Sequence, residues 1–527
     1  MHSRLFLGWY CRCRLSFLGC EGASGLPPVR SPGRGCRGKQ PESGRQCRAG
    51  ERQNRAGSMS EFTSAFRRSF RRLTWHGGRP SPRPGGAKGR ASEKGIERSI
   101  SVEEKKPEQE ASRYSAQSFF EYLVVVSLKK SGAVYEPQIA YQFPKRENLM
   151  RSQKEEEENL LKAIPLFCFP DGNTWAPLTE YESETFSFVL TNMDGSRKFG
   201  YCRRLLPRGG GARLPEVFCI ISCLGCFGLF SQILDEVEKR RQISLAVIYP
   251  FMQGLREAAF PAPGKTVSVK SFIPESGTEI IKLTRPSDSR LEHVDFSSLF
   301  KHLSEENVIQ IFASLLLERR LIFLAEELSI LSQCIHGIAA LLYPFTWQHT
   351  FIPVLPKVMV DIVCSPTPFV VGVQRQFLEQ LQELPIEECL MVDLHSGTFL
   401  KTVGDEHDIL PRKLYKEVLN ALQNQRKANQ SCQELNNMVT NTFVVFFIKI
   451  VGHYSSHLKQ NGNETTFQER QFRKSVTSKS IRRFLKTFME TQMFSLFVQE
   501  LQGQPCSQEG FFEQKIKEHQ ENRNKIK

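Results

Sequence analysis

The stretch LLLERRLIFLAEELSILSQCIHGIAALLYPFTWQHTFIPVLP (residues 315–356) decides the fold of this chain. It begins with a short, wholly apolar run at 321–325, and an apolar helical segment at 328–342 follows directly, ended by Pro344. Further strand-like runs lie at 349–355, 358–363 and 369–373. Strands and helices that alternate in this way predict a mostly parallel sheet that is covered on both faces.

Helical patterns flank this stretch. Ser304 is a good N-cap residue, and the apolar residues between Val308 and Leu316 recur behind it at helical spacing. Beyond Leu410 the pattern is almost entirely helical, over residues 411–426, 435–457 and 477–501. We therefore expect a second, C-terminal lobe of α/β class that ends in helices.

The upstream part has the pattern of an antiparallel sheet. Runs rich in aromatic and β-branched residues, which are typical of strands, lie at 119–128, 138–143, 165–169, 185–191, 197–206 and 217–223. Asp194-Gly195 predicts a tight hairpin between two of these runs. Residues 154–163 favour a helix, whereas 264–290 form a less regular join. The first lobe is therefore expected to be an antiparallel α+β layer.

The formal net charge of +15 belongs to the first hundred residues, which contain 21 Lys and Arg against 6 Asp and Glu. The remaining residues carry 50 charges of each sign, which excludes a generally basic nucleic-acid-binding body. Residues 1–58 lack a periodic apolar pattern and are expected to be disordered. A mitochondrial transit peptide and an alternative start before Met59 are both open interpretations. Of the 15 cysteines, the ten in the body are interpreted as reduced cytosolic thiols.

Residues 59–75 (MSEFTSAFRRSFRRLTW) are the periodic segment of this leader. Apolar residues share one helical face and arginines the other, and the membrane-contact candidates are Phe62, Phe66, Arg67, Arg68, Phe70, Arg71 and Arg72. A short basic amphipathic helix is typical of an interfacial anchor on anionic lipid. The alternatives are an isolated charged segment and one that docks on the protein's own body.

Motifs for catalysis, metals and cofactors all fail in the body. Gly264-Lys265-Thr266 ends like a P-loop, but Ala259 stands where that motif requires its first glycine. Cys223 and Cys226 have metal-ligand spacing without a second pair, so buried thiols are the better interpretation. The residues therefore predict a binding protein with no catalytic residues, metal or cofactor.

Three segments, in order, carry a resemblance to a known family. The central one is the run at 315–356 with CSPTPFVVGV (residues 364–373), and helices at 410–501 form the downstream one. The upstream one comprises FFEYLVVVSL (119–128), IPLFCFPDG (164–172) and ETFSFVLTNMDGSRKFGYCRRLLP (184–207). Over residues 110–500 the chain resembles the DENN-domain family, and within it the type-2 subfamily and its short D-type branch.

The resemblance implies a bilobed α/β protein with a longin-like first lobe, an α/β second lobe and a Rab GTPase held between them. It also implies guanine nucleotide exchange in vesicle trafficking, on a late-endosome-type Rab, without an indispensable catalytic side chain. Such a factor binds the nucleotide-free GTPase better than the GDP form and lowers GDP affinity by the same ratio. The implied parts are a leader (1–111), the upstream (112–258), central (275–410) and downstream (411–501) DENN parts, and a polar tail (502–527).

The best-matched motif within the resemblance is YPFTWQH (residues 343–349), whose aromatic residues fit a core as well as an interface. The candidates for the GTPase interface are Arg319, Arg320, Trp347, Gln348 and His349. Two other functions stay open: a scaffold that binds a Rab without exchange, and a membrane or cytoskeletal adaptor that acts through residues 59–75. In each case we expect a cytosolic protein that contacts endosomal membranes peripherally and binds no nucleic acid.

Overall fold

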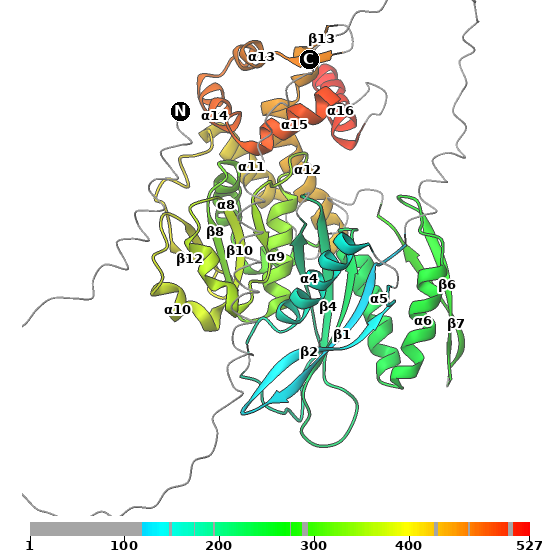
Figure 1. Cartoon of the computed structure of the whole chain (residues 1–527). Helices are drawn as coiled ribbons and strands as arrows, with labels where there is room; N and C mark the ends of the chain where they lie inside the picture. Colours follow the sequence, from blue (N-terminus) through cyan, green and yellow to red (C-terminus); the bar gives the residue numbers. More distant parts are fainter. Residues whose placement is uncertain are drawn as a thin grey trace, which may run out of the picture. The chain divides into compact units, whose positions relative to one another are not determined.

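The computed structural model describes residues 118–146, 150–172, 174–192, 195–274, 276–286, 294–425, 430–461, 464–503 and 510–526. The expected leader (1–111) and its amphipathic segment (59–75) lie outside these residues. Two five-stranded sheets organise the described part of the chain, each in a different lobe (Figure 1).

The first lobe is built on an antiparallel sheet with the strand order β2-β1-β5-β4-β3. Its strands are β1 (Tyr122–Ser131), β2 (Val134–Phe143), β3 (Glu184–Thr191), β4 (Arg197–Leu205) and β5 (Glu216–Ser222). The hairpin predicted around Asp194-Gly195 is confirmed, because β3 and β4 pair in register from Glu184 with Arg204 to Thr191 with Arg197. The expected antiparallel α+β lobe is therefore confirmed.

Both faces of this first sheet are covered. Tyr122, Val124 and Val126 of β1 pack in the core that contains α4 (Arg151–Cys168), whereas Leu123 and Val125 pack with α5 (Phe227–Arg241) and α6 (Leu245–Glu257). This alternation follows from the two-residue period of a strand. The central strands are therefore apolar on both sides, which explains their unbroken hydrophobic runs.

The second lobe is built on a sheet with the order β12-β11-β8-β10-β9, in which β11, β8, β10 and β9 are parallel and β12 is antiparallel. This confirms the predicted mostly parallel sheet. The strands are β8 (Leu321–Ala325), β9 (Thr350–Ile352), β10 (Phe369–Gln374), β11 (Leu390–Asp393) and β12 (Thr398–Lys401). The helices of this lobe are α7 (Ser297–His302), α8 (Glu305–Leu316), α9 (Leu328–Ala340), η1 (Lys357–Cys364), η2 (Arg375–Phe377) and α10 (Leu378–Gln382).

Two local features of this lobe follow directly from the sequence. Ser304 caps α8 as predicted, because its side chain accepts a hydrogen bond from the backbone N–H of Asn307 at 3.2 Å. Gly372 in β10 leaves room for a crossing segment, since a Cβ there would lie 2.1 Å from the carbonyl oxygen of Pro353. A side chain at position 372 would therefore separate β10 from the loop and from α9.

Three predicted elements differ in the structure. Residues 165–169 were expected as a strand, but α4 continues to Cys168. Ile164 and Phe167 become fully buried in this helix, and the free energy of their burial outweighs the cost of Pro165 inside it. The strand expected at 358–363 is instead η1, in which Met359, Val360 and Val363 are buried at helical rather than alternating spacing. The irregular join at 264–290 contains a hairpin of β6 (Thr266–Ile273) and β7 (Gly277–Thr284).

The downstream part consists mainly of helices that gather beyond one end of the second sheet (Figure 1). Its elements are α11 (Arg412–Gln425), α12 (Cys432–Val451), η3 (Tyr454–His457), β13 (Leu458–Asn461), β14 (Glu464–Phe467), α13 (Glu469–Ser475), α14 (Lys479–Phe488), α15 (Gln492–Gly503) and α16 (Phe511–Ile526). The segment expected as a polar tail thus forms α16, whose Phe512 and Ile516 are buried.

Among the described helices, the one at Cys432–His457 is long and apolar enough to cross a membrane, but 61% of its apolar window is buried inside the protein.

We expect Leu316→Ala to destabilise the protein by about 2–5 kcal/mol, since Leu316 is fully buried on α8 and its truncation leaves a cavity. The measurement is chemical denaturation of the variant and of a matched control, Leu400→Ala, whose side chain on β12 is 46% exposed. The control should change stability by less than about 0.5 kcal/mol. Equal stability of the two variants would contradict the assignment of Leu316 to the core.

Candidate functional site

The two lobes meet where α9 of the second lobe packs against β3 of the first. The backbone N–H of Ser329 donates to the Glu184 carboxylate at 2.9 Å, and the backbone N–H of Ser187 donates to the Ser332 hydroxyl at 3.4 Å. The hydrophobic core continues across this seam without interruption. A partner that touches both lobes therefore meets a preformed surface rather than two independent ones.

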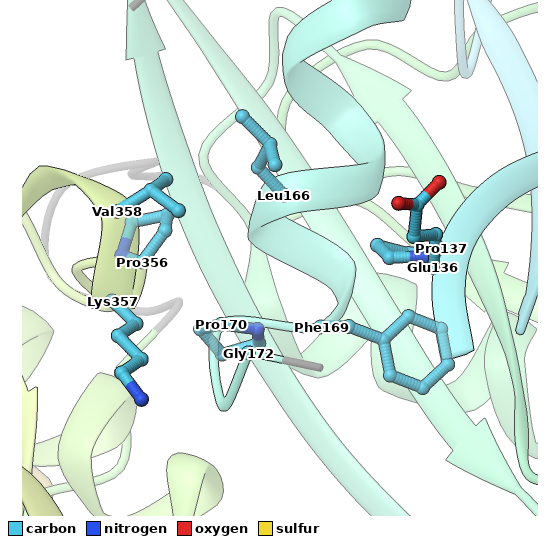
Figure 2. A pocket seen from close by; sticks show the side chains of 9 residues that line it. All are labelled: Glu136, Pro137, Leu166, Phe169, Pro170, Gly172, Pro356, Lys357 and Val358. Carbon is cyan, nitrogen blue, oxygen red and sulfur yellow. The ribbon is translucent and has the colours of Figure 1, made fainter. Parts of the chain in front are cut away.

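A hollow of about 120 Å³ lies at this seam, and its lining residues come from both lobes. Figure 2 shows η1 on one side, β2 on the other and the end of α4 between them; the lining residues are Glu136, Pro137, Leu166, Phe169, Pro170, Gly172, Pro356, Lys357 and Val358. A backbone hydrogen bond from Lys357 to the Pro170 carbonyl (3.0 Å) joins the two lobes beside it. The volume is well below the roughly 300–1,000 Å³ of small-molecule sites. The hollow can accept a side chain of a protein partner, but not a nucleotide.

Apolar groups dominate this hollow, and one of them is open to solvent. Val358 is 38% exposed, although most valines of the described body are buried. Lys357, next to it, lies with its amino group 5.5 Å from the centre of the Phe377 ring. Val358 therefore adds an accessible apolar side chain at the edge of the hollow.

The two arginines predicted for an interface are held by carboxylates of the second lobe. Arg319 donates two hydrogen bonds to Asp405, at 2.5 and 2.7 Å, which lowers the pKa of that carboxyl below its ordinary value. Arg320 pairs with Glu387 at 3.0 Å. Both carboxylates are more than half exposed, so both pairs lie at the surface, where such pairs contribute little stability.

The three candidates from the YPFTWQH motif occupy different environments. Trp347 is 3% exposed, and its indole N–H donates to the Thr350 carbonyl at 3.1 Å, while its own carbonyl accepts a hydrogen bond from Arg197 of the first lobe. Gln348 is half-buried, and its side-chain amide donates to the Thr346 carbonyl at 2.9 Å. The ring of His349 lies 5.4 Å from that of Trp347. Trp347 therefore lies at the seam between the lobes, whereas His349 pairs with Glu318 of its own lobe.

Glu318 is the residue of this region that sequence analysis did not select. Its backbone has a φ of 52°, which is left-handed and unusual for a residue with a side chain. Its carboxylate accepts the backbone N–H groups of Gln492 and Met493, at 3.0 and 2.8 Å, and lies 3.0 Å from the His349 Nε2. Burial alone would raise the pKa of Glu318, but these partners outweigh burial and lower it. No sequence signal marks such a residue, because both its φ and its partners arise from tertiary structure.

Glu318 therefore connects three parts of the chain. The N–H groups at the start of α15 have no partners within their own helix, and the carboxylate supplies acceptors for two of them. A negative charge at a helix N-terminus is also favoured by the helix dipole. Since β8 begins just after Glu318, this contact fixes the downstream helices to the second sheet and to the motif at 343–349.

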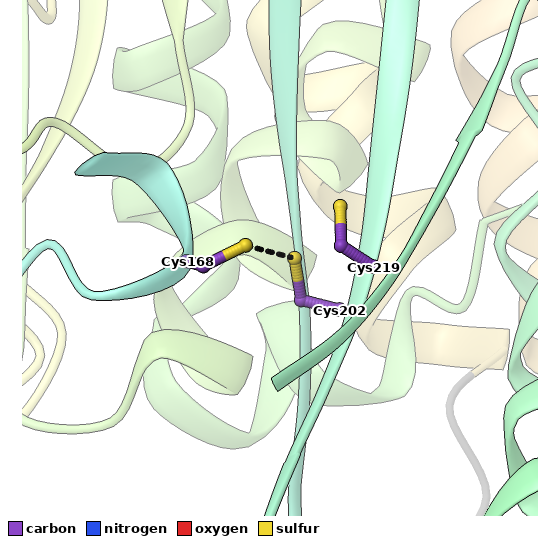
Figure 3. A group of neighbouring side chains, drawn as sticks. All are labelled: Cys168, Cys202 and Cys219. Atoms are coloured by element: carbon purple, nitrogen blue, oxygen red, sulfur yellow. Dashed lines mark hydrogen bonds between the residues drawn. The ribbon is translucent and has the colours of Figure 1, made fainter. Parts of the chain in front are cut away.

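Three of the five described cysteines of the first lobe form a cluster that could hold a metal ion (Figure 3). The sulfur atoms of Cys168, Cys202 and Cys219 lie within 4.8 Å of one another, and all three residues are buried. Burial raises the pKa of Cys202 and of Cys219 well above the ordinary value of a thiol. Burial would also raise the pKa of Cys168, but the two neighbouring thiols and the charge of Arg204 outweigh burial and lower it. Structural zinc needs four ligands, and no fourth joins this group within the described residues. These residues do not fit a closed zinc site.

Of the Cys223–Cys226 pair, Cys226 is buried but Cys223 is exposed, so the interpretation as buried thiols is wrong for Cys223. The P-loop-like motif also differs from its expected structural context. Thr266, which would close a P-loop, begins strand β6 rather than a helix. A P-loop places phosphate at the N-terminus of a helix, so Gly264-Lys265-Thr266 has the wrong structural context for nucleotide binding. The functional surface of this chain is therefore sought in protein contacts.

Three family models match the chain in order: the uDENN domain at residues 137–205, the DENN (AEX-3) domain at 213–397 and the dDENN domain at 467–515. Human DENN domain-containing protein 2D is 64% identical over 414 residues, which cover 78% of this chain and 88% of that protein. The mouse protein of the same name is 63% identical, with the same coverage. Human DENN domain-containing protein 2B is 55% identical over 79% of this chain, but only 37% of that protein is covered. The chain belongs to the DENN-domain family.

The three matches follow the order of the elements, but the DENN match crosses the boundary between the two lobes. The uDENN match lies on the first sheet, the DENN match runs from β5 through the second sheet, and the dDENN match begins at β14 and extends into α16. Similarity to proteins 2D and 2B, and also to 2A and 2C, makes this chain a type-2 DENN protein. Glu318 lies within the DENN match, and it accepts hydrogen bonds from the first N–H groups of α15, a helix within the dDENN match.

We expect Glu318→Gln to destabilise this DENN protein by about 1.5–3 kcal/mol, because glutamine keeps the size of the side chain but loses the charge that strengthens its hydrogen bonds. The pKa of Glu318 is lower in the folded protein than its ordinary value of 4.5, so its contribution is fully present above about pH 4.5. It should disappear as the pH falls through the lowered native pKa. The measurement is thermal unfolding of both proteins across this range.

Glu326→Gln serves as the matched control, because Glu326 is 63% exposed and its pairing with Arg375 is a surface contact. It should change stability little at any pH. A Glu318→Gln protein that matched this control at neutral pH would show that the carboxylate does not hold α15.

Proposed function

We propose that this protein is a guanine nucleotide exchange factor that promotes GDP release from a Rab GTPase of the late-endosome type. DENN-domain proteins are regulators of GTPases and generally act as exchange factors for Rabs. The observation that carries the proposal is the complete, ordered match of all three DENN parts in one chain. A cytosolic protein that associates with endosomal membranes is the corresponding location.

The surface that we assign to the GTPase is the lobe seam, with the hollow between β2, the end of α4 and η1 as its centre. The GTPase would place a side chain in this hollow and contact Val358 beside it. In this proposal Trp347 and His349 of the second lobe stabilise the seam. Arg319 and Arg320 contact the GTPase only at the edge of the binding surface. An anchor side chain in a small apolar hollow is a common source of binding energy in protein interfaces.

Such a factor needs no catalytic side chain. If this surface binds the nucleotide-free Rab more tightly than the GDP-bound Rab, thermodynamic linkage requires that it lower the affinity of the Rab for GDP by the same factor. The continuous core between the lobes supports this mechanism, because it presents residues of both lobes to one partner. Binding without a preference between the two Rab states would make the protein a scaffold instead.

We expect the full chain to accelerate the release of fluorescent GDP from at least one Rab, and the measurement is a screen across purified Rab GTPases. The variant Val358→Glu should reduce this acceleration about tenfold or more, because it places a charge beside the apolar hollow. Its melting temperature should be unchanged, since Val358 is partly exposed.

Leu400→Glu is the matched control for Val358→Glu, since Leu400 is 46% exposed on β12 and lies outside the residues that line the hollow. It should leave exchange intact. Absence of acceleration on every Rab, with a folded protein that still binds one of them, would establish the scaffold function. Loss of exchange in the control but not in Val358→Glu would move the GTPase site to β12.

For the leader we expect weak, reversible binding to anionic liposomes through residues 59–75. Each arginine near an anionic surface contributes on the order of 1 kcal/mol, so replacement of Arg67, Arg68, Arg71 and Arg72 by Gln should release this contact. Cosedimentation with liposomes measures it, and exchange in solution should be unaffected. If the variant instead stays on liposomes but loses exchange, residues 59–75 belong to the GTPase site or its regulation.

A further inference from the structure

The dDENN part contains a second hollow, of a different chemical kind. It measures about 400 Å³, and its five lining residues are all cationic: Arg473, Lys479, Arg482, Arg483 and Lys486. They come from α13 and α14, two helices that pack against each other. Between residues 469 and 486 the sequence has seven Lys and Arg and a single acidic residue, although the chain beyond residue 100 is neutral as a whole.

The arrangement of α14 explains why these charges converge. Phe484, Leu485 and Phe488 on one face of this helix are buried in the core, so the basic residues must lie on the opposite face. Arg482 is fixed in place, because its guanidinium donates two hydrogen bonds, at 3.0 and 2.7 Å, to the carbonyl of Val476 in the turn before the helix. Lys479, Arg483 and Lys486 are exposed and surround it.

These cations are not neutralised by the fold. Within the described part of the chain, none of the five forms an ion pair with a carboxylate, in contrast to Arg203, Arg204, Arg240 and Arg241 of the first lobe. Like charges that share a small volume repel one another, and a bound polyanion relieves that repulsion. Guanidinium and ammonium groups are also the preferred protein ligands of phosphate.

We propose that this hollow binds the phosphorylated headgroup of an inositol phospholipid and so holds the folded body on a membrane. The size of the hollow suits a compact anion with several phosphates, and its position on an exposed helix face gives a membrane surface access to it. A nucleic acid is a poorer occupant, because single strands are bound by aromatic side chains as well as cations, and no aromatic residue lines this hollow. Its lining residues are not part of the leader segment at 59–75, and we expect exchange in solution to be unaffected by their replacement.

The test uses the full chain with Lys479→Gln, Arg483→Gln and Lys486→Gln combined. Arg482 is left intact because it holds the turn. The matched control carries Lys270→Gln, Lys282→Gln and Lys416→Gln, three exposed lysines that line no part of the hollow. Both proteins lose the same net charge, so nonspecific attraction to an anionic surface falls equally in the two.

Binding is measured by cosedimentation with phosphatidylcholine vesicles that contain phosphatidylinositol bisphosphate, and with phosphatidylserine vesicles of equal total charge. The α14 variant should bind the bisphosphate vesicles about a hundredfold more weakly than the control, with no change in melting temperature. The natural chain should prefer bisphosphate to phosphatidylserine vesicles. If the triple variant fails to fold, Arg483→Gln alone should still reduce this preference, because its side chain is exposed.

Several results would overturn the proposal. Equal binding of the α14 variant and the control would show that the hollow is not used. Equal binding of the natural chain to both kinds of vesicle would show that it recognises charge rather than a headgroup. Calorimetric binding of free inositol hexakisphosphate without vesicle binding would make this a site for a soluble phosphate, and equally strong competition by a single-stranded oligonucleotide would make it a nucleic-acid site.

Discussion

The structure depends on one helix that is buried on two sides. α9 packs against β8 and β10 of the second sheet and also against β3 of the first. Of the residues of α9 only Gln333 is exposed, so both lobes must form for the apolar surface of this helix to be covered. His336 shows this double burial: its ring lies 4.1 Å from that of Phe227 in the first lobe and 5.5 Å from that of Phe351 in the second.

The candidate GTPase surface is a consequence of this packing. Residues 136–137, 166–172 and 356–358 are far apart in the chain, and they approach one another because α9 packs on β3 and because the Lys357 N–H donates to the Pro170 carbonyl. The surface therefore exists before any partner arrives. A protein that acts by preferring one state of its partner needs a surface that binds the two states with different affinities.

The elements that could be predicted from the sequence are those whose pattern reflects local burial. The β3–β4 hairpin, the capped helix α8 and the wholly apolar strand β8 were correct because their periodicity and turn residues agree with their final environment. The α4 extension and η1 were missed because their short apolar runs fit a strand and a helix equally well until the neighbouring sheets are placed. The β6–β7 hairpin was missed because the buried positions of β6 include Ser271.

The candidate site was less predictable than the fold, for a physical reason. Trp347 and His349 could be chosen because a motif marks them, and their role in a GTPase interface stays a prediction, although their rings lie 5.4 Å apart. The hollow beside Val358 and the left-handed Glu318 could not, because each is defined by residues brought together from distant segments. Sequence patterns record what a residue does for its own helix or strand, whereas an interface depends on how different elements approach one another.

The charged residues show the same difference between what the sequence reveals and what only the structure reveals. The balanced charge of the body argued correctly against a uniformly basic surface, but a sum over the body cannot show which cations the fold itself uses. Arg204, 3% exposed, is held by Asp171 and surrounded by three aromatic rings, so its charge stabilises the first lobe. The cations around Arg482 have no such carboxylate among the described residues, and they stand on a helix whose other face is buried. A charge that is paired and buried within the fold contributes to its stability, while an exposed charge that the fold leaves unpaired stays available to an anionic ligand. The second kind therefore identifies a binding surface more reliably than the net charge of the chain does.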